Sequence, residues 1–178
     1  MSAGIGSVWT VLAEARLAPG FGPLLLVGDG EALTQVWFAP HRDRRGIPAR
    51  ALTEGRDDGA DPVLRAAADQ LAGYFAGTRT GFDLPLRPAG TPFQLSVWQA
   101  LRGIPYGTRT TYGAIAAGLG HAPGASRAVG LANGANPLPI VVPCHRVVGS
   151  DGSLTGFGGG LERKRALLEI ESAGHRLF

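Results

Sequence analysis

The stretch Pro137-Leu138-Pro139-Ile140-Val141-Val142-Pro143-Cys144-His145-Arg146-Val147-Val148 (residues 137–148) is the most informative part of the sequence. An apolar run with three prolines ends at Pro143, directly before the only cysteine of the chain. Proline restricts the backbone ahead of the thiol, so Cys144 is held in place. A thiolate is the nucleophilic form of cysteine, and a nearby base or positive charge favours it. His145 and Arg146 are the first candidates for these roles.

Adjacent residues of a strand point to opposite faces, so a direct hydrogen bond between Cys144 and His145 would be strained. A bridging water or a turn after Pro143 would relieve that strain. A carboxylate that orients the imidazole would complete a nucleophile–base arrangement. The C-terminal helix offers three candidates for it, namely Glu162, Glu169 and Glu171.

A single cysteine rules out an intramolecular disulfide and a zinc site built from several cysteines. On composition alone, a lone cysteine is most often a small buried hydrophobic residue. The functional interpretation of Cys144 depends on its neighbours.

The chain has 178 residues, 44% of them hydrophobic and 17% charged, which is typical of a soluble globular protein. No apolar run approaches the roughly 18 residues that span a bilayer, and residues 1–5 do not resemble a signal peptide. We therefore expect a cytoplasmic, monomeric protein without a membrane partner. Residues 1–88 carry nine Arg against ten acidic residues, whereas residues 89–178 carry eight Lys and Arg against four. The basic excess of the second half suits a polyanion or a solvated surface.

The first half predicts a mixed α/β unit. The apolar run 24–27, the turn 28–30 and the strand formers 33–38 indicate a β-hairpin, and residues 8–12 suggest another strand. The segment 42–59 is charged and contains Gly, Pro and Asp, so it predicts a loop.

A helix is expected from Pro62, with Asp61 as its N-cap and Gly77 as its end. Its apolar stripe consists of Val63, Ala67, Leu71, Tyr74 and Phe75. The proline-rich residues 85–90 then form the expected linker between one domain at 1–84 and a second at 91–178.

The second half predicts several short helices. Thr91, Pro92 and Gln94 are typical of a helix start, and Phe93, Val97 and Leu101 continue it. Thr110 is the expected cap of the next helix, which runs through Tyr112 and Ile115 to Gly120. A third helix starts near Ala125. Two short helices joined by a tight turn outline a helix-turn-helix.

Small side chains dominate the helix over residues 127–135. Three explanations remain open: close helix packing, a poor helix, or a surface that a large partner approaches closely. The helix lacks long polar side chains beyond Arg127, so contact with DNA would be largely independent of base sequence.

The sequence resembles the O6-alkylguanine-DNA alkyltransferases. Six segments match that family in order and in spacing, apart from a difference of about one residue in the loop before Arg127, and they cover residues 91–171 densely. The segments are Phe93-Gln94 with Val97-Trp98, Ile104-Pro105-Tyr106-Gly107 leading to Tyr112, Ser126-Arg127-Ala128-Val129-Gly130, Asn136-Pro137, Pro143-Cys144-His145-Arg146-Val147, and Gly159-Gly160-Leu161 to Glu171. The resemblance implies an α+β protein, with a small RNase H-like N-terminal domain and a helical C-terminal domain carrying a helix-turn-helix.

The resemblance also implies catalytic roles. Cys144 is the expected alkyl acceptor, His145 the base that acts through a water, Glu171 the carboxylate that orients it, and Asn136 the hinge before the active-site segment. Tyr112 is expected to crowd the DNA phosphate, promote base rotation and protonate the departing guanine.

The remaining implied roles concern DNA and the lesion. Arg127 is expected to fill the gap left by the flipped base, and the other DNA contacts are expected from Tyr112, Ala128, Gly130 and Ser150. The pocket is expected to be lined by Pro139, Val147, Phe157 and Gly158. The implied activity is a single transfer of an alkyl group from O6-alkylguanine, and from O4-alkylthymine, in double-stranded DNA to Cys144, without an obligate protein partner. Because the thioether formed has no easy leaving route, the resemblance implies a protein that acts once, with no metal and no cofactor.

Two departures from the family pattern stand out. The N-terminal cysteines that hold zinc in some members are absent, and Phe157-Gly158 replaces the Tyr-Ser of better-studied members. Because Gly158 lacks a side chain, we expect tolerance of larger O6 adducts. Two rival functions remain: an alkyltransferase-like lesion binder, which would lack the acceptor cysteine, and a Cys-His hydrolase with an incidental helix-turn-helix.

Overall fold

The computed structural model describes residues 8–11, 21–22, 24–38 and 61–174. The chain divides into two compact units, Met1–Pro88 and Ala89–Phe178. Each unit is described by itself. No helix within the described ranges is long and apolar enough to cross a membrane.

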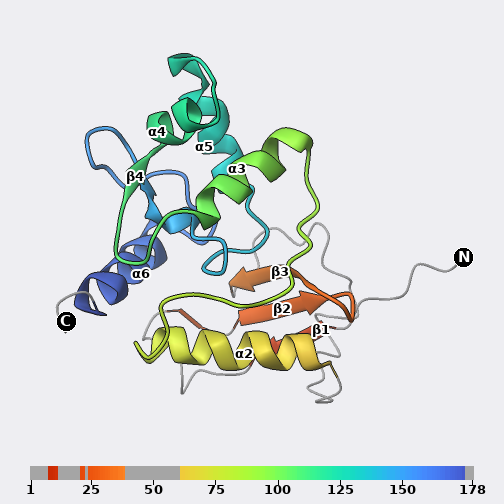
Figure 1. Cartoon of the computed structure of the whole chain (residues 1–178). Helices are drawn as coiled ribbons and strands as arrows, with labels where there is room; N and C mark the ends of the chain where they lie inside the picture. Colours follow the sequence, from red (N-terminus) through yellow and green to blue (C-terminus); the bar gives the residue numbers. More distant parts are fainter. Residues whose placement is uncertain (1–7, 12–20, 23, 39–60, 175–178) are drawn as a thin grey trace, which may run out of the picture. The chain divides into compact units, whose positions relative to one another are not determined.

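Unit 1 contains a three-stranded antiparallel sheet in the order β1-β2-β3 (Figure 1). The strands are β1 (Val8–Val11), β2 (Leu24–Gly28) and β3 (Leu33–Phe38). The predicted hairpin is confirmed, with Leu24 opposite Phe38 and a register shift at Val27/Gly28. The predicted loop over 42–59 lies outside the described residues.

Helix α2 (Pro62–Phe75) packs along this sheet (Figure 1). Asp61 caps it as predicted, accepting hydrogen bonds from the amides of Val63 and Leu64 at 2.9 and 3.1 Å. One part of the predicted stripe is wrong, because Leu64 is fully buried whereas Val63 is half-exposed. The helix is oriented so that Leu64, and not Val63, points toward the sheet. The side chains that face the sheet then recur every three to four residues, at Leu64, Ala67, Leu71 and Tyr74.

The first part of the expected linker pairs with unit 1. The Leu33 amide donates to the Pro85 carbonyl at 2.8 Å, and the Arg87 amide donates to the Leu33 carbonyl at 3.0 Å. The Arg87 guanidinium also binds the carboxylates of Asp29 and Glu31. Residues 85–87 thus extend the edge of the sheet, and the division between the units follows Pro88.

Unit 2 is mainly helical. Its helices are α3 (Pro92–Arg102), α4 (Tyr112–Gly118), α5 (Ser126–Gly134) and α6 (Leu161–Gly174). The predicted capping box of α3 is present: Thr91 Oγ1 accepts from the Gln94 amide, and Gln94 Oε1 accepts from the Thr91 amide. Helix α5 contacts both α3 and α4, and its buried residues are Val129, Ala132 and Asn133.

The helix-turn-helix consists of α4 and α5, joined through the short 3-10 helix η1 (Pro123–Ala125). The cap prediction at Thr110 is wrong by one residue, because Thr111 Oγ1 accepts the hydrogen bond from the Ala114 amide at 3.1 Å. Thr110 instead belongs to β4 (Thr110–Thr111), which pairs in parallel with β5 (Val147–Val148). This pairing brings the start of α4 beside the segment that follows Cys144.

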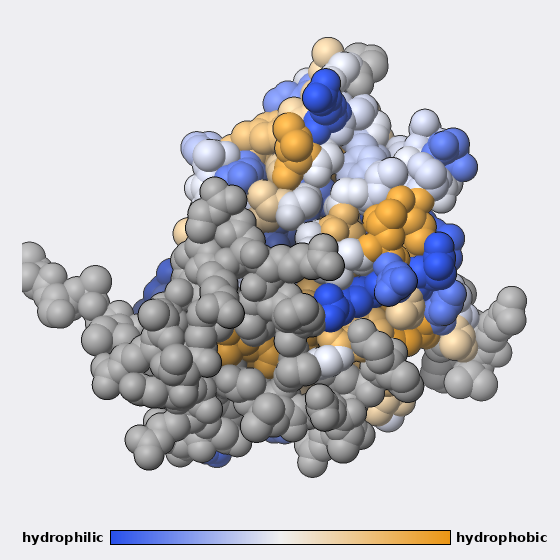
Figure 2. Space-filling model, turned by 180° about the vertical axis from the view of Figure 1, so that it is seen from behind, coloured by the Kyte–Doolittle hydropathy of each residue, from blue (hydrophilic) through white to orange (hydrophobic). Residues whose placement is uncertain are grey.

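The exposed surface is mixed in polarity. On the face seen in Figure 2, hydrophobic residues form separate small patches with hydrophilic residues between them. Within the described part of the chain, the large hydrophobic side chains that are exposed are Leu95, Leu131 and Leu161. Leu131 stands out among them because it is 72% exposed and lies on α5.

Candidate active site

Cys144 lies in a short 3-10 helix, η2 (Cys144–Arg146), that directly follows Pro143. The structure has the turn that was expected after Pro143, so Cys144 and His145 do not alternate across a strand. The thiol is only 2% exposed. Burial raises the pKa of Cys144 to about 11, although a hydrogen bond from the Asn136 side chain and the charge of Lys164 oppose the shift. The resting cysteine is therefore a thiol at neutral pH.

Asn136 braces the segment that leads to Cys144. Its Oδ1 accepts from the Leu138 amide at 3.0 Å, and its Nδ2 donates to the Val142 carbonyl at 2.9 Å. Between these two points, buried Ile140 adopts a φ of 75°. A β-branched residue in this region is strained, so the surrounding contacts must hold it there. The residue expected to be a hinge thus fixes a strained turn and also reaches the thiol.

His145 and Glu171 form a buried pair. His145 Nε2 lies 2.8 Å from Glu171 Oε1, and the two side chains are 0% and 1% exposed. Burial lowers the pKa of His145, and the hydrogen bond to Glu171 opposes the shift. Burial also resists ionisation of Glu171, but hydrogen bonds from His145 and Arg146 outweigh it and lower its pKa to about 2. The pair is therefore a neutral imidazole beside a carboxylate. Glu162 and Glu169 are exposed.

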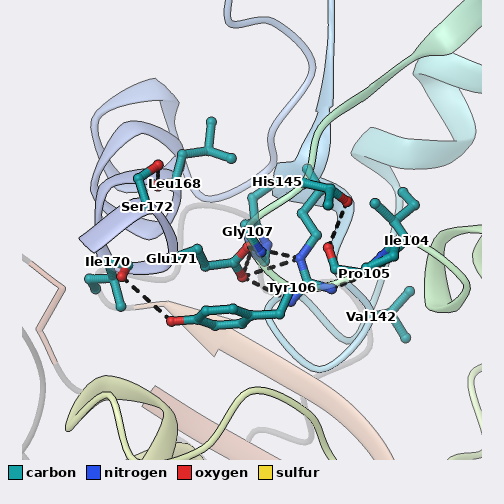
Figure 3. A network of polar contacts seen from close by, with 12 residues as sticks. Ile104, Pro105, Tyr106, Gly107, Val142, His145, Leu168, Ile170, Glu171 and Ser172 are labelled. Carbon is teal, nitrogen blue, oxygen red and sulfur yellow. Dashed lines mark hydrogen bonds and ion pairs between the residues drawn. The ribbon is translucent and has the colours of Figure 1, made fainter. Parts of the chain in front are cut away.

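Arg146 binds Glu171 rather than Cys144. Its guanidinium donates to both oxygens of the Glu171 carboxylate, and Nη1 donates to the Ile104 carbonyl at 2.6 Å. The Gly107 amide donates to Glu171 Oε2 at 3.0 Å. Figure 3 shows how these contacts join α6 to the turn at 104–107. The sequence placed Arg146 near the thiol; its actual partner is the carboxylate, because η2 turns its side chain toward α6.

Lys164, the only lysine of the chain, supplies the positive charge near Cys144. Its side chain is fully buried, and Nζ donates to the Val147 carbonyl at 2.5 Å and to the Thr155 carbonyl. Burial lowers the pKa of Lys164 to about 8, and a thiolate at Cys144 would oppose this shift. Sequence reasoning missed this residue, because a lysine in a helix ordinarily lies in solvent.

Tyr112 starts α4 and faces the same place. Its hydroxyl donates to the Thr155 carbonyl at 2.7 Å and lies 3.4 Å from Lys164 Nζ. Burial raises the pKa of Tyr112, so the phenol stays protonated at neutral pH. The β4–β5 pairing and the Lys164 contacts therefore bring a phenol and an ammonium group to the cysteine segment.

Three of the other residues expected to bind DNA are exposed, and the fourth packs against Tyr112. Arg127, Ala128 and Ser150 are exposed. Gly130 instead faces the Tyr112 ring, at 3.8 Å from the position that a Cβ atom would take. Leu131, one helical turn after Arg127, shares its exposed face and was not singled out in the sequence.

Most residues of the expected pocket are buried. Pro139, Val147 and Phe157 are buried around the cysteine segment, whereas Gly158 is exposed. A Cβ atom on Gly158 would lie 3.2 Å from the Gly134 carbonyl oxygen of α5. The space left by the missing side chain thus borders a helix backbone, and the expected tolerance of larger O6 adducts stays a prediction.

Asn133 is a second residue that the sequence did not reveal. It is 1% exposed at the end of α5, and its Nδ2 donates to the carbonyls of Cys144 and Gly156 at 3.3 and 2.9 Å. Nothing in the local sequence distinguishes it from a polar residue on a helix surface. In the described ranges, no three His, Cys, Asp or Glu side chains are grouped to hold a metal ion.

These elements define a class of protein: an α+β chain whose helical unit sets a helix-turn-helix beside a buried cysteine and an imidazole–carboxylate pair. Residues 92–173 match the model of the 6-O-methylguanine DNA methyltransferase, DNA binding domain, family. A methylated-DNA–protein-cysteine methyltransferase of Mycobacterium tuberculosis is 52% identical over 152 residues, which cover 85% of this chain and 87% of that protein. The protein of the same name from Salmonella typhimurium is 47% identical over 164 residues, covering 90% and 95%.

Solved structures of methyltransferases from this family also match the fold of the chain. The crystal structure of Mycobacterium tuberculosis OGT in complex with DNA matches with a TM-score of 0.78 and 48% identity, covering 94% of this chain and 93% of that one. The crystal structure of the O6-methylguanine methyltransferase from the same organism matches with a TM-score of 0.77 and 46% identity, covering 95% and 94%. The chain belongs to the methylated-DNA–protein-cysteine methyltransferase family. The resemblance and the fold class inferred from the sequence are confirmed.

Proposed function

We propose that the chain repairs O6-alkylguanine in double-stranded DNA by moving the alkyl group to Cys144 in a single, irreversible transfer. DNA repair by alkyl transfer to a protein cysteine is the activity of the family, and Cys144 is the only cysteine. The observation that carries the residue assignment is the buried pair of neutral His145, which directly follows that cysteine, and ionised Glu171 of α6. O4-alkylthymine carries the same kind of O-alkyl bond and is proposed as a second substrate.

The first step is removal of the thiol proton. Because Nε2 of His145 is hydrogen-bonded to ionised Glu171, Nε2 carries the imidazole hydrogen. The proton from Cys144 therefore goes to the other nitrogen, Nδ1, through a bridging water. The imidazolium formed is stabilised by the Glu171 carboxylate. Lys164 adds a positive charge that favours the thiolate over the thiol. A thiol with a pKa of about 11 thus stays protonated, and therefore unreactive, until His145 removes its proton.

The second step exchanges one bond for another. A sulfur lone pair forms the bond to the alkyl carbon, and the electrons of the carbon–O6 bond leave with guanine. Guanine is a poor leaving group as an anion, so Tyr112 donates its phenolic proton to it. Lys164 Nζ, 3.4 Å from that hydroxyl, stabilises the phenolate left behind. The thioether has no easy reverse route, which makes the protein a reagent used once.

DNA is the partner of the helix-turn-helix. The alkylated base must leave the stack, at a cost of a few kcal/mol. Exposed Arg127 is suited to fill the gap, and exposed Ala128 allows α5 to approach a groove closely. The basic excess of residues 89–178 favours binding to the phosphate backbone.

A turnover experiment separates this proposal from its rivals. With methylated duplex in large excess, we expect one equivalent of duplex to be repaired per protein, after which the reaction stops. Continued product formation would identify a catalyst such as a Cys-His hydrolase. Binding without any repair would identify a lesion binder. The Cys144→Ser variant is the matched control, and we expect it to bind the duplex without repairing it.

A further inference from the structure

A short loop, Thr155–Gly158, connects the parts of the proposed pocket. The Thr155 carbonyl accepts hydrogen bonds from Tyr112 and Lys164. The side chain of Phe157 is buried. The loop therefore lies beside the residues assigned to the chemistry.

The loop lies very close to α4 and α5. A Cβ atom on Gly156 would fall 2.6 Å from the Tyr112 hydroxyl oxygen, a distance at which something must shift. The Cβ atom of a residue in place of Gly158 would fall 3.2 Å from the Gly134 carbonyl oxygen. Both glycines thus permit a close approach of the loop to the helix-turn-helix.

One side chain fastens this contact. Asn133 extends from the last turn of α5, and its buried Nδ2 group donates to the Gly156 carbonyl at 2.9 Å and to the Cys144 carbonyl at 3.3 Å. A single amide thus joins the proposed DNA-binding helix, the acceptor cysteine and the loop. The end of α5 is itself fixed, because Trp98 Nε1 donates to the Ala132 carbonyl at 2.8 Å.

We propose that Asn133 is a positioning residue that clamps the Thr155–Gly158 loop to helix α5, and thereby sets the largest O6 adduct that the pocket accepts. This inference rests on the proposed function. With the clamp in place, the loop resists the outward movement that a bulky aromatic adduct needs, so the transfer of such an adduct is slow. Without it, the loop can move away from α5, and both large and small adducts gain room.

If the clamp is lost, methyl and benzyl transfer should respond differently. A methyl group needs no extra room, so loosening the loop removes only the precise placement of the methyl carbon and slows its transfer. A benzyl group needs the room, so loosening the loop offsets that loss. The ratio of the benzyl to the methyl transfer rate therefore reports the position of the loop, independently of how much folded protein is present.

The test compares Asn133→Leu and Asn133→Ala with the wild type in single-turnover transfer from duplexes that contain O6-methylguanine or O6-benzylguanine. We expect the benzyl-to-methyl ratio to rise about fivefold, the change that loss of one ordinary hydrogen bond would produce. Affinity for undamaged duplex should stay within about twofold, because Asn133 is buried away from the exposed face of α5.

Trp98→Phe is the matched control. It removes a hydrogen bond to a neighbouring carbonyl of the same helix end but leaves the loop contacts intact. We expect its ratio to equal that of the wild type. If the Asn133 variants slow both substrates in equal proportion, or if Trp98→Phe shifts the ratio equally, the clamp is contradicted. Methyl transfer by the wild type in the same assay tests the proposed function separately.

Discussion

His145 Nε2 lies 2.8 Å from Glu171 Oε1, and both side chains are shielded from solvent. Two residues that are 26 positions apart thus form one acid–base unit. The carboxylate fixes the tautomer of the imidazole and the direction of its second nitrogen. The reactivity of Cys144 should therefore depend on a residue in a different element, α6.

Replacing Glu171 with Gln tests that dependence. The amide cannot stabilise an imidazolium, so we expect the single-turnover methyl transfer rate to fall about a hundredfold, within the range for general base catalysis. The change also leaves Arg146 without its counter-charge in a buried site, which should lower the free energy of unfolding by about 3 kcal/mol. Rates are measured on protein shown to be folded by circular dichroism. The control is Glu169→Gln, a change at an exposed position of the same helix. Equal transfer rates for the two variants would show that Glu171 has no part in the reaction.

Arg146 should control the pH at which His145 is a base. His145 faces the charged groups Glu171, Arg146 and Lys164, and both cations lower its pKa. Removing one of them, in Arg146→Met, raises the pKa of His145 and keeps it protonated to higher pH. We therefore expect the acid limb of the pH–rate profile to move to higher pH, whereas Arg146→Lys keeps the charge and most of the wild-type profile. If the transfer rate of Arg146→Met falls equally at every pH and the acid limb does not move, Arg146 has only a structural role.

Stability should fall in acid, in two stages. The pKa of His145 is below its ordinary value, so the unfolded chain binds more protons below about pH 6.5, and stability falls as the pH drops through that range. Glu171, with a pKa of about 2, adds a second loss as the pH falls below about 4.5. The slope is at most about 1.4 kcal/mol per pH unit for each proton. Urea unfolding of the wild type and of His145→Gln checks this, since only the wild type should lose stability between about pH 6.5 and 5. Equal slopes would argue against a buried neutral imidazole.

Arg127 should matter for duplex DNA and not for the chemistry at the thiol. The Arg127→Ala variant loses the group that is proposed to fill the gap in the stack, so we expect transfer from methylated duplex to slow about tenfold. The reaction with the free base O6-benzylguanine needs no base flipping and should be unchanged. Arg165→Ala removes an exposed charge from another helix and serves as the control. If both substrates slow equally in Arg127→Ala, the residue acts on the pocket instead.

The local patterns of the sequence predicted the secondary structure well, because caps and stripes depend on neighbouring residues. The Asp61 cap, the Thr91 capping box and the hairpin are all of this kind. The Thr110 prediction failed because two adjacent threonines offer equal caps, and the pairing of β4 with β5 decides between them.

The site was predictable only where a motif carried it. Cys144, His145 and Glu171 belong to matched segments, and the structure brings the latter two together. Lys164 and Asn133 were missed because their importance comes from burial against segments distant in sequence. The surroundings of Gly158 were also beyond the sequence, because its closeness to the Gly134 carbonyl comes from packing against α5.

The central claim is that Cys144 is the alkyl acceptor, and peptide mass spectrometry tests it most directly. The protein is mixed with an equal amount of duplex containing O6-methylguanine, digested, and compared with protein mixed with undamaged duplex. The account predicts one added methyl group on the peptide that contains Cys144, together with the loss of O6-methylguanine from the duplex. An unmodified Cys144 peptide after complete repair, or a methyl group on any other residue, would contradict it.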